Sequence, residues 1–185
     1  MAKLHYINNV SLDGYCEDEQ GAFEWGPMPD DVFQTYIELL KPVGTFLYGR
    51  RLYETMSGWE TMPALAEQSA LTAEFSGVWK APNKVVYSST LTDVATRNTR
   101  IERTFDPGKV VAMKAEVEGE LTIGGANLAA QAIKAGVVDE VRLFVWPITV
   151  GSGKPALPAG IGYTLLGFRR FDNGAVLLQY KPSAR

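Results

Sequence analysis

The segment that most constrains the fold is GELTIGGANLAAQAIKAG, at residues 119–136. It predicts a short apolar strand, residues 121–123, that passes through Gly124 and Gly125 directly into an amphipathic helix, residues 127–135. Successive glycines let a ligand approach bare backbone N–H groups, and the positive end of the following helix attracts anions. The pattern therefore predicts a pyrophosphate site. The alternative is that the glycines only permit tight packing of the strand against the helix.

The length and composition favour one ordinary globular domain, residues 1–185. A formal net charge of −3 gives no electrostatic reason to expect nucleic acid or a membrane surface as a partner. With one cysteine, Cys16, and one histidine, His5, the chain cannot form an internal disulfide framework or a cysteine-rich zinc site, and we expect no metal. It contains no signal-like segment and no apolar run long enough to span a bilayer, which predicts a soluble cytoplasmic protein.

Strand and helix patterns alternate along most of the chain. Strands are expected at residues 4–12, 46–48, 84–87, 110–113, 121–123 and 140–147, and helices at 28–40, 50–56, 63–79 and 127–135. A final pair of strands, residues 163–171 and 175–181, flanks Asp172-Asn173-Gly174, which is a strong hairpin turn signal. The sequence thus predicts an α/β fold with a mixed, mostly parallel sheet, helices on both faces and a C-terminal antiparallel hairpin.

Two strand ends carry residues suited to a nucleotide. Arg50 and Arg51 follow Gly49 after the strand at 46–48, and Ser88 and Ser89 follow the strand at 84–87. A dinucleotide site that selects NAD commonly places a carboxylate on the ribose hydroxyls, and no carboxylate stands there. Hydroxyls together with arginines suit a ribose 2′-phosphate better. Taken alone, the two arginines would be interpreted as an ordinary charged surface.

The substrate side is marked by fewer residues. Asp31 stands in the first turn of the helix at 28–40, Thr35 lies one turn further on, and Trp25 belongs to an acidic loop at residues 16–26. An aspartate at the mouth of an apolar cleft can hold a flat, partly polar ring and help deliver a proton. We therefore predict Trp25, Asp31 and Thr35 as substrate-binding residues and Asp31 as catalytic. The alternative for Asp31 is a charge that only stabilises the helix start.

Five motifs are spread over nearly the whole chain, namely Ser11-Leu12-Asp13-Gly14, Tyr48-Gly49-Arg50-Arg51-Leu52-Tyr53-Glu54, Val85-Val86-Tyr87-Ser88-Ser89, Thr122-Ile123-Gly124-Gly125-Ala126 and Val150-Gly151-Ser152-Gly153-Lys154-Pro155. Together they resemble the dihydrofolate reductase fold, and most closely its branch containing the reductase (C-terminal) domain of bifunctional riboflavin-biosynthesis deaminase-reductases. Each motif alone is weak, whereas five in the family's order form a specific set. The resemblance implies a three-layer α/β fold.

The resemblance also implies NADPH as cofactor. Its phosphates would meet Gly49, Arg50 and Arg51, its 2′-phosphate and adenine side Ser88 and Ser89, and its pyrophosphate Gly124, Gly125, Ala126, Asn127 and Leu128. The backbone near Asn9 and Val10 would meet the nicotinamide amide. Leu52 departs from the family, which often has a phosphate-contacting threonine at this position.

The activity implied is hydride transfer to a C=N or C=O bond of a pyrimidine- or pteridine-type molecule, as in 5-amino-6-(5-phosphoribosylamino)uracil reductase. Asp31 takes the place of the substrate-binding carboxylate of dihydrofolate reductases. Dihydrofolate reductase activity, or an NADPH-binding module without turnover, remain alternatives. The deaminase half is absent, because its zinc signature needs several cysteines. The acidic loop offers no base for a substrate phosphate, so a distant cation such as Lys154 would have to supply it.

Large apolar residues near the C-terminus predict a homodimer. Phe144 and Trp146 on one expected strand, and Phe168 and Phe171 on another, are more than one sheet face easily buries. The resemblance points the same way, since this branch commonly pairs through its sheet. The alternative is that these aromatics lie beneath the helices.

Overall fold

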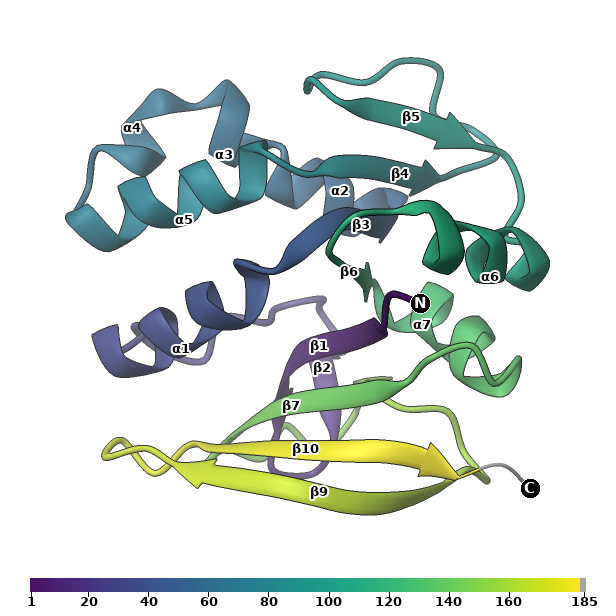
Figure 1. Cartoon of the computed structure of the whole chain (residues 1–185). Coiled ribbons are helices and arrows are strands. Elements are labelled where there is room, and N and C mark those ends of the chain that lie inside the picture. The colour runs from purple at the N-terminus through teal and green to yellow at the C-terminus, as the bar shows by residue number, and fades with distance from the viewer. Residues whose placement is uncertain (184–185) are drawn as a thin grey trace.

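A mixed eight-stranded sheet forms the centre of the protein in the computed structural model, which describes residues 1–183 (Figure 1). In spatial order its strands are β5 (Thr99–Glu102), β4 (Asn83–Tyr87), β3 (Val43–Gly49), β6 (Glu120–Gly124), β1 (Leu4–Ser11), β7 (Glu140–Trp146), β10 (Val176–Ser183) and β9 (Gly162–Arg170). The strands from β5 to β7 are parallel, while β10 and β9 are antiparallel to their neighbours. A separate antiparallel pair joins β2 (Tyr15–Asp18) to β8 (Gly153–Pro155).

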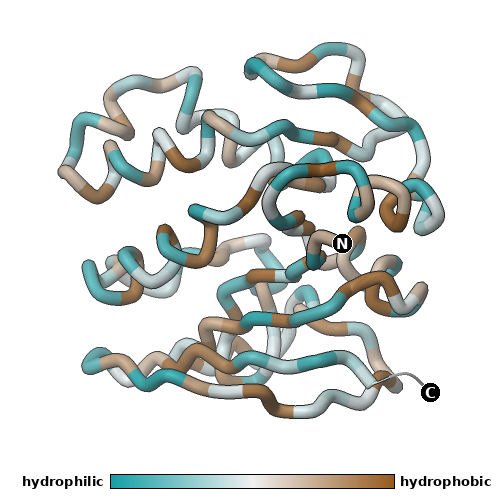
Figure 2. The backbone as a smooth tube through the Cα atoms, viewed as in Figure 1, coloured by the Kyte–Doolittle hydropathy of each residue, from teal (hydrophilic) through white to brown (hydrophobic). Residues whose placement is uncertain are grey.

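Helices cover both faces of this sheet, so the protein has three layers (Figure 1). On one face lie α1 (Asp30–Leu40), α2 (Arg50–Met56), α3 (Gly58–Thr61), α4 (Pro63–Ala66) and α5 (Ala70–Lys80), and on the other α6 (Pro107–Glu116) and α7 (Ala126–Lys134). Figure 2 shows hydrophobic positions along the central strands and at intervals along the helices. Each face therefore has its own apolar core, one under α1 and α5 and one under α6 and α7.

The central strand β1 shows why the chain folds in this way. Leu4, Tyr6 and Val10 point into the core under α6 and α7, whereas Ile7 packs into the core under α1 and α5. A strand between two helical layers must be apolar on both sides, because side chains alternate between the faces. Within residues 1–183, no helix is both long and apolar enough to cross a membrane.

The structure confirms the predicted fold, including the strand, glycine turn and helix at residues 120–134 and the C-terminal hairpin. The strand predicted at residues 110–113 is wrong, because these residues lie in α6. Pro107 occupies the first turn of that helix, and the Asp106 side chain caps it by accepting from the Gly108 N–H at 2.8 Å. The helix predicted at residues 63–79 is two helices, since a capping box between Ser69 and Thr72 starts α5 anew.

Candidate functional site

The site begins where β3 and β6 end side by side, each at a glycine. A Cβ on Gly124 would stand 2.4 Å from Leu52 Cδ2 and 3.0 Å from two ring carbons of Tyr48, so any other residue there would force Leu52 to move and would crowd Tyr48. Gly125 has a φ of 95° and precedes α7, a conformation that other residues rarely adopt. The first N–H groups of a helix have no partner within it. The turn therefore presents bare backbone donors at the carboxyl end of the sheet.

A pocket of about 260 Å³ opens beside this turn. Its lining includes five residues that the sequence assigned to the cofactor, namely Gly49, Ser88, Ser89, Asn127 and Leu128. It also includes four residues that the sequence did not assign, namely Tyr87, Arg103, Phe105 and Gln131. Ser88 is buried, and its Oγ accepts from the Leu91 N–H at 2.9 Å, which shapes the loop after β4. Ser89 is exposed at the rim. Four segments distant in the sequence thus meet here because the strands that carry or precede them, β5, β4, β3 and β6, are neighbours in the sheet.

The two predicted arginines diverge. Arg50 pairs with Glu54 at 2.7 Å and donates to Thr90 Oγ1 at 2.8 Å, which keeps it beside the serine loop. Arg51 instead reaches Glu17 on β2 at 3.2 Å. Neither lines the pocket, so their assigned contacts with phosphate remain predictions.

Arg103 is the cation that sequence reasoning missed. Its Nη1 donates to the backbone oxygens of Ser88 at 3.1 Å and Leu91 at 2.6 Å, and the residue lines the pocket. It follows directly after β5, whose parallel pairing with β4 brings both strand ends to one place. The short, polar strand β5 was not predicted, which is why Arg103 escaped notice.

The backbone of β1 is open on one side at this end of the sheet. Its pairing with β6 stops at Tyr6 opposite Ile123, whereas its pairing with β7 continues to Ser11 opposite Trp146. Asn9 and Val10 therefore lie beyond the last β6 partner. The Asn9 side chain is held by the Trp146 Nε1–H, which donates to Oδ1 at 3.0 Å.

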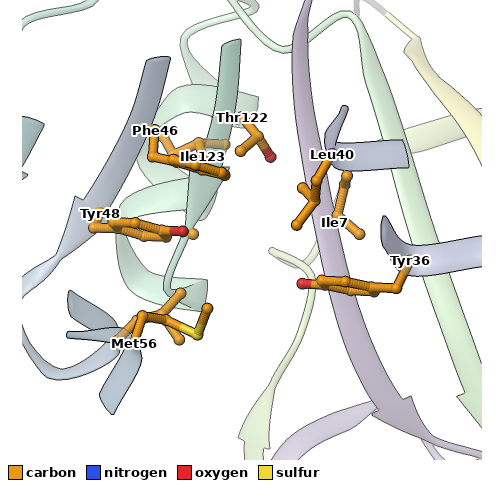
Figure 3. Close-up of a pocket in the computed structure, with 10 residues that line it drawn as sticks. Ile7, Tyr36, Leu40, Phe46, Tyr48, Met56, Thr122 and Ile123 are labelled. Carbon is orange, nitrogen blue, oxygen red and sulfur yellow. The ribbon is translucent and has the colours of Figure 1, made fainter. Parts of the chain in front are cut away.

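A second, apolar cavity of about 40 Å³ lies on the α1 side of the same strand ends (Figure 3). Its lining combines residues of β1, α1, β3, α2 and β6, namely Ile7, Tyr36, Leu40, Phe46, Tyr48, Leu52, Met56, Thr122, Ile123 and Gly124. Burial raises the pKa of Tyr36 to about 12. Burial is also the largest cause that raises the pKa of Tyr48. Both phenols are therefore neutral at physiological pH.

The predicted substrate residues are close in sequence to Tyr36, which lines this cavity, but they do not line it themselves. Asp31 is exposed in the first turn of α1, and its Oδ1 accepts from the Val32 N–H at 2.9 Å. Thr35 is buried and donates to the backbone oxygen of Asp31 at 2.7 Å. Trp25 is half-buried, and its indole nitrogen has no hydrogen-bond partner among the described residues. The roles assigned to these three residues remain predictions.

Lys154, suggested by the sequence as a distant cation, lies on β8 and contacts Glu17 Oε1 at 3.0 Å. The same oxygen accepts from Arg51, at 3.2 Å. One carboxylate on β2 thus holds two cations from β8 and α2. This cluster of three charged residues connects the β2–β8 sheet to the start of α2.

Together, the helix-covered, mostly parallel sheet, its C-terminal antiparallel strands and the glycine turn define an α/β protein of the dihydrofolate reductase fold. Residues 2–177 match the RibD C-terminal domain family, and the chain belongs to that family. The uncharacterized protein YyaP of Bacillus subtilis is 26% identical over 92% of this chain and 90% of its own length.

Solved structures show the same fold at lower identity. A provisionally named riboflavin biosynthesis protein from Shewanella sp. PV-4 has a TM-score of 0.75 and 20% identity, with full coverage of both chains. A Thermotoga maritima deaminase/5-amino-6-(5-phosphoribosylamino)uracil reductase has a TM-score of 0.64 and 14% identity, and the match covers 98% of this chain and 57% of that one. Dihydrofolate reductase from Enterococcus faecalis, solved with NADP(H), has a TM-score of 0.65 and 17% identity, with coverage of 98% and 97%.

Proposed function

We propose that this protein is an NADPH-dependent reductase that transfers hydride to a C=N or C=O bond of a pyrimidine- or pteridine-type small molecule. The observation that carries the proposal is that two cavities lie at the ends of the neighbouring strands β3 and β6, one lined by Gly49 and the other by Gly124. One cavity is lined by Gly49 and serine, arginine and asparagine side chains, and the other by apolar and phenolic groups. A nucleotide and a small ring would thus lie end to end across the glycine turn.

The residues present fit NADPH. Bare glycine backbone at Gly49, Gly124 and Gly125 and the start of α7 suit the pyrophosphate. Ser88, Ser89 and Arg103 suit the extra phosphate of the ribose, since arginine binds phosphate through charge-assisted hydrogen bonds. The open backbone at Asn9 and Val10 suits the carboxamide of the nicotinamide. Bound there, NADPH would supply the hydride.

We further propose that the substrate lies on the α1 side of the turn, with Asp31 at its edge. The Thermotoga protein is named for reduction of a phosphoribosylaminopyrimidine, and a related step of riboflavin biosynthesis is the reaction we favour. A substrate of that kind carries a phosphate. Arg51 and Lys154 could bind it if the phosphate displaces the carboxylate of Glu17 that they share.

One experiment tests these proposals together. The purified protein is mixed with NADPH and one candidate substrate at a time, namely a ribosylaminopyrimidine, a pteridine or dihydrofolate, and the loss of NADPH absorbance is followed. Calorimetry measures the binding of NADPH alone. Turnover of an aminopyrimidine supports the proposal, and turnover of dihydrofolate alone would assign dihydrofolate reductase activity. Tight NADPH binding without any turnover would favour a binding module. Absence of NADPH binding would refute the reductase.

We also propose that the protein forms a homodimer through β9. This edge strand exposes Leu165, Leu166 and Phe168, the last with 70% of its surface accessible. The sequence expectation named three further aromatics, but Phe144, Trp146 and Phe171 are buried in the core under α1 and α5. A free strand edge with adjacent apolar side chains favours pairing with a second copy.

A further inference from the structure

A further pocket, of about 550 Å³, lies at the edge of the sheet where β3 and β4 begin. This is the opposite edge from the glycine turn, which follows the carboxyl end of β6 beside that of β3. Its lining consists of three short segments, residues 43–45, 81–83 and 116–118. The first begins β3, the second joins α5 to β4, and the third runs on from the last residue of α6. The pocket is therefore separate from both cavities of the proposed reductase site.

Both charged side chains in this lining are acidic. Glu116 and Glu118 are exposed, and neither forms an ion pair or a side-chain hydrogen bond with any residue in 1–183. In addition, α5 and α6 both end at the pocket, and the C-terminal end of a helix carries a partial negative charge. The pocket therefore favours a positively charged ligand.

A buried hydroxyl in the same lining has no partner. Thr45 has only 3% of its surface accessible. Its Oγ1 forms no hydrogen bond within residues 1–183, yet it is not closed off from solvent. Because Thr45 lines the pocket, this oxygen opens into it. Buried polar groups are nearly always hydrogen-bonded, so the inner wall of the pocket offers an acceptor for a ligand that donates.

The hydroxyl and the acidic segment lie on adjoining walls. A Cβ on Gly44 would overlap the backbone oxygen of Glu118, so the start of β3 packs directly against residues 116–118. The opposite wall, between α5 and β4, already binds an ammonium group from behind. The buried Lys84 donates through Nζ to the backbone oxygens of Pro82 at 3.1 Å and Lys80 at 3.3 Å. Those oxygens are occupied, which leaves Thr45 and the two carboxylates for a ligand.

We propose that this pocket binds a protonated aliphatic amine, whose ammonium group donates to the Thr45 hydroxyl and pairs with Glu116 and Glu118. An ammonium has three donors and no acceptor, which matches one hydroxyl and two carboxylates. Four other lining residues are apolar and suit a carbon chain, namely Val43, Ala81, Pro82 and Val117.

The size of the pocket and its ligands favour an organic cation over a metal ion. Its volume is in the range of small-molecule sites. Within residues 1–183, no group of three or more histidine, cysteine, aspartate or glutamate side chains could hold a metal. The site is independent of the proposed reductase activity, because it shares no lining residue with the other two cavities.

Two matched probes test the proposal in NMR titrations at constant ionic strength. 1,4-Diaminobutane carries ammonium groups where 1,4-butanediol carries uncharged hydroxyls, and the carbon chains are the same. We expect the diamine to bind about ten-fold more tightly or better, because hydrogen bonds to charged groups are the stronger ones. Its chemical-shift changes should map to residues 43–45, 81–83 and 116–118.

Variants of the acceptors provide the second measurement. Thr45→Val keeps the shape of the side chain without its hydroxyl and should weaken diamine binding about five-fold. The double variant Glu116→Gln/Glu118→Gln should weaken it about ten-fold and leave the affinity for the diol unchanged. Glu67→Gln is the matched control, since Glu67 is an exposed acid after α4, outside the lining, and should leave both affinities unchanged. Thermal unfolding checks that each variant is folded.

The proposal is overturned if the diamine does not bind, if the diol binds as tightly, or if the shift changes map outside the three segments. Wild-type diamine affinity in both Thr45→Val and the double variant would also overturn it. Displacement of the diamine by MgCl2, but not by NaCl of equal ionic strength, would assign the pocket to a metal ion instead. Saturating NADPH should leave diamine affinity unchanged, whereas competition between the two would place the amine at the glycine turn. Failure of NADPH to bind would refute the reductase and leave the amine site standing.

Discussion

Gly124→Ala tests whether the glycine turn is set by close packing. The added Cβ would stand 2.4 Å from Leu52 Cδ2 and 3.0 Å from the ring of Tyr48, whereas carbon atoms prefer separations of about 3.5–4.0 Å. The Tyr48 ring cannot easily retreat, because Trp79 and Phe46 hold it. Overpacking of this kind costs about 1–3 kcal/mol. For a domain of this size we expect Tm to fall by roughly 4–8 °C for a loss of about 2 kcal/mol.

The assay is thermal unfolding, with Gly77→Ala as the matched control. Gly77 lies inside α5, where a Cβ would meet nothing within 4 Å, so alanine should stabilise the helix by about 0.5–1 kcal/mol. A double-mutant cycle adds Leu52→Ala, which removes the nearest atom. Gly124→Ala should then cost about 1 kcal/mol less than it costs in the wild type. An unchanged Tm for Gly124→Ala, or strictly additive costs in the cycle, would refute the packing argument.

Four further predictions address the cofactor, the substrate, assembly and pH. In calorimetry the protein should bind NADPH more tightly than NADH. Arg103→Ala should lower the affinity for NADPH about ten-fold or more, with little effect on the affinity for NADH, while Arg97→Ala, outside the pocket, should change neither. Equal affinities of the wild type for both cofactors would contradict this prediction. Asp31→Asn should lower turnover of an active substrate far more than NADPH affinity, and a wild-type rate with the same pH profile would remove Asp31 from the mechanism. Light scattering at micromolar concentration should give a dimer mass for the wild type and a monomer mass for Phe168→Glu; a monomeric wild type would count against the interface. Burial lowers the pKa of Lys84 from 10.5 to about 8. Between these pH values the unfolded chain binds more protons than the folded one, so the free energy of unfolding should rise with pH, by up to about 1.4 kcal/mol per pH unit. In denaturant titrations Lys84→Met should lose this rise, whereas an equal rise in both proteins would show that Lys84 is not its source.

Local signals in the sequence were sufficient to locate the glycine turn and the serine loop that follows β4. The glycine pair marks a turn, because a Cβ on Gly124 would crowd Leu52 and Tyr48 and Gly125 has a φ that other residues rarely adopt. Ser88 and Ser89 directly follow an apolar strand. Such signals survive in a single sequence because each depends on neighbours only a few residues away. The fold class followed from the same kind of evidence, because strand-type and helix-type hydrophobic patterns alternate along the chain and each pattern is contained in one contiguous segment.

The errors arose where local patterns are ambiguous. Residues 110–113 are apolar enough for a strand, and only the cap at Asp106 and the inward spacing of Val110 and Lys114 make them helical. The strand β5 contains two charged residues in four, so no apolar pattern marked it. Arg103 was missed for the same reason.

The sequence alone determined the class of fold, the position of the glycine turn and the family to which the chain belongs, because these depend on short-range patterns and motif order. Only the tertiary structure decided which groups face one another. It turned Arg51 toward Glu17, placed Arg103 beside Ser88 and set the hydroxyl of Tyr36 across the cavity from Tyr48. These meetings depend on which strands are neighbours and on how α1 packs against the sheet, and residues far apart along the chain carry no local signal of either.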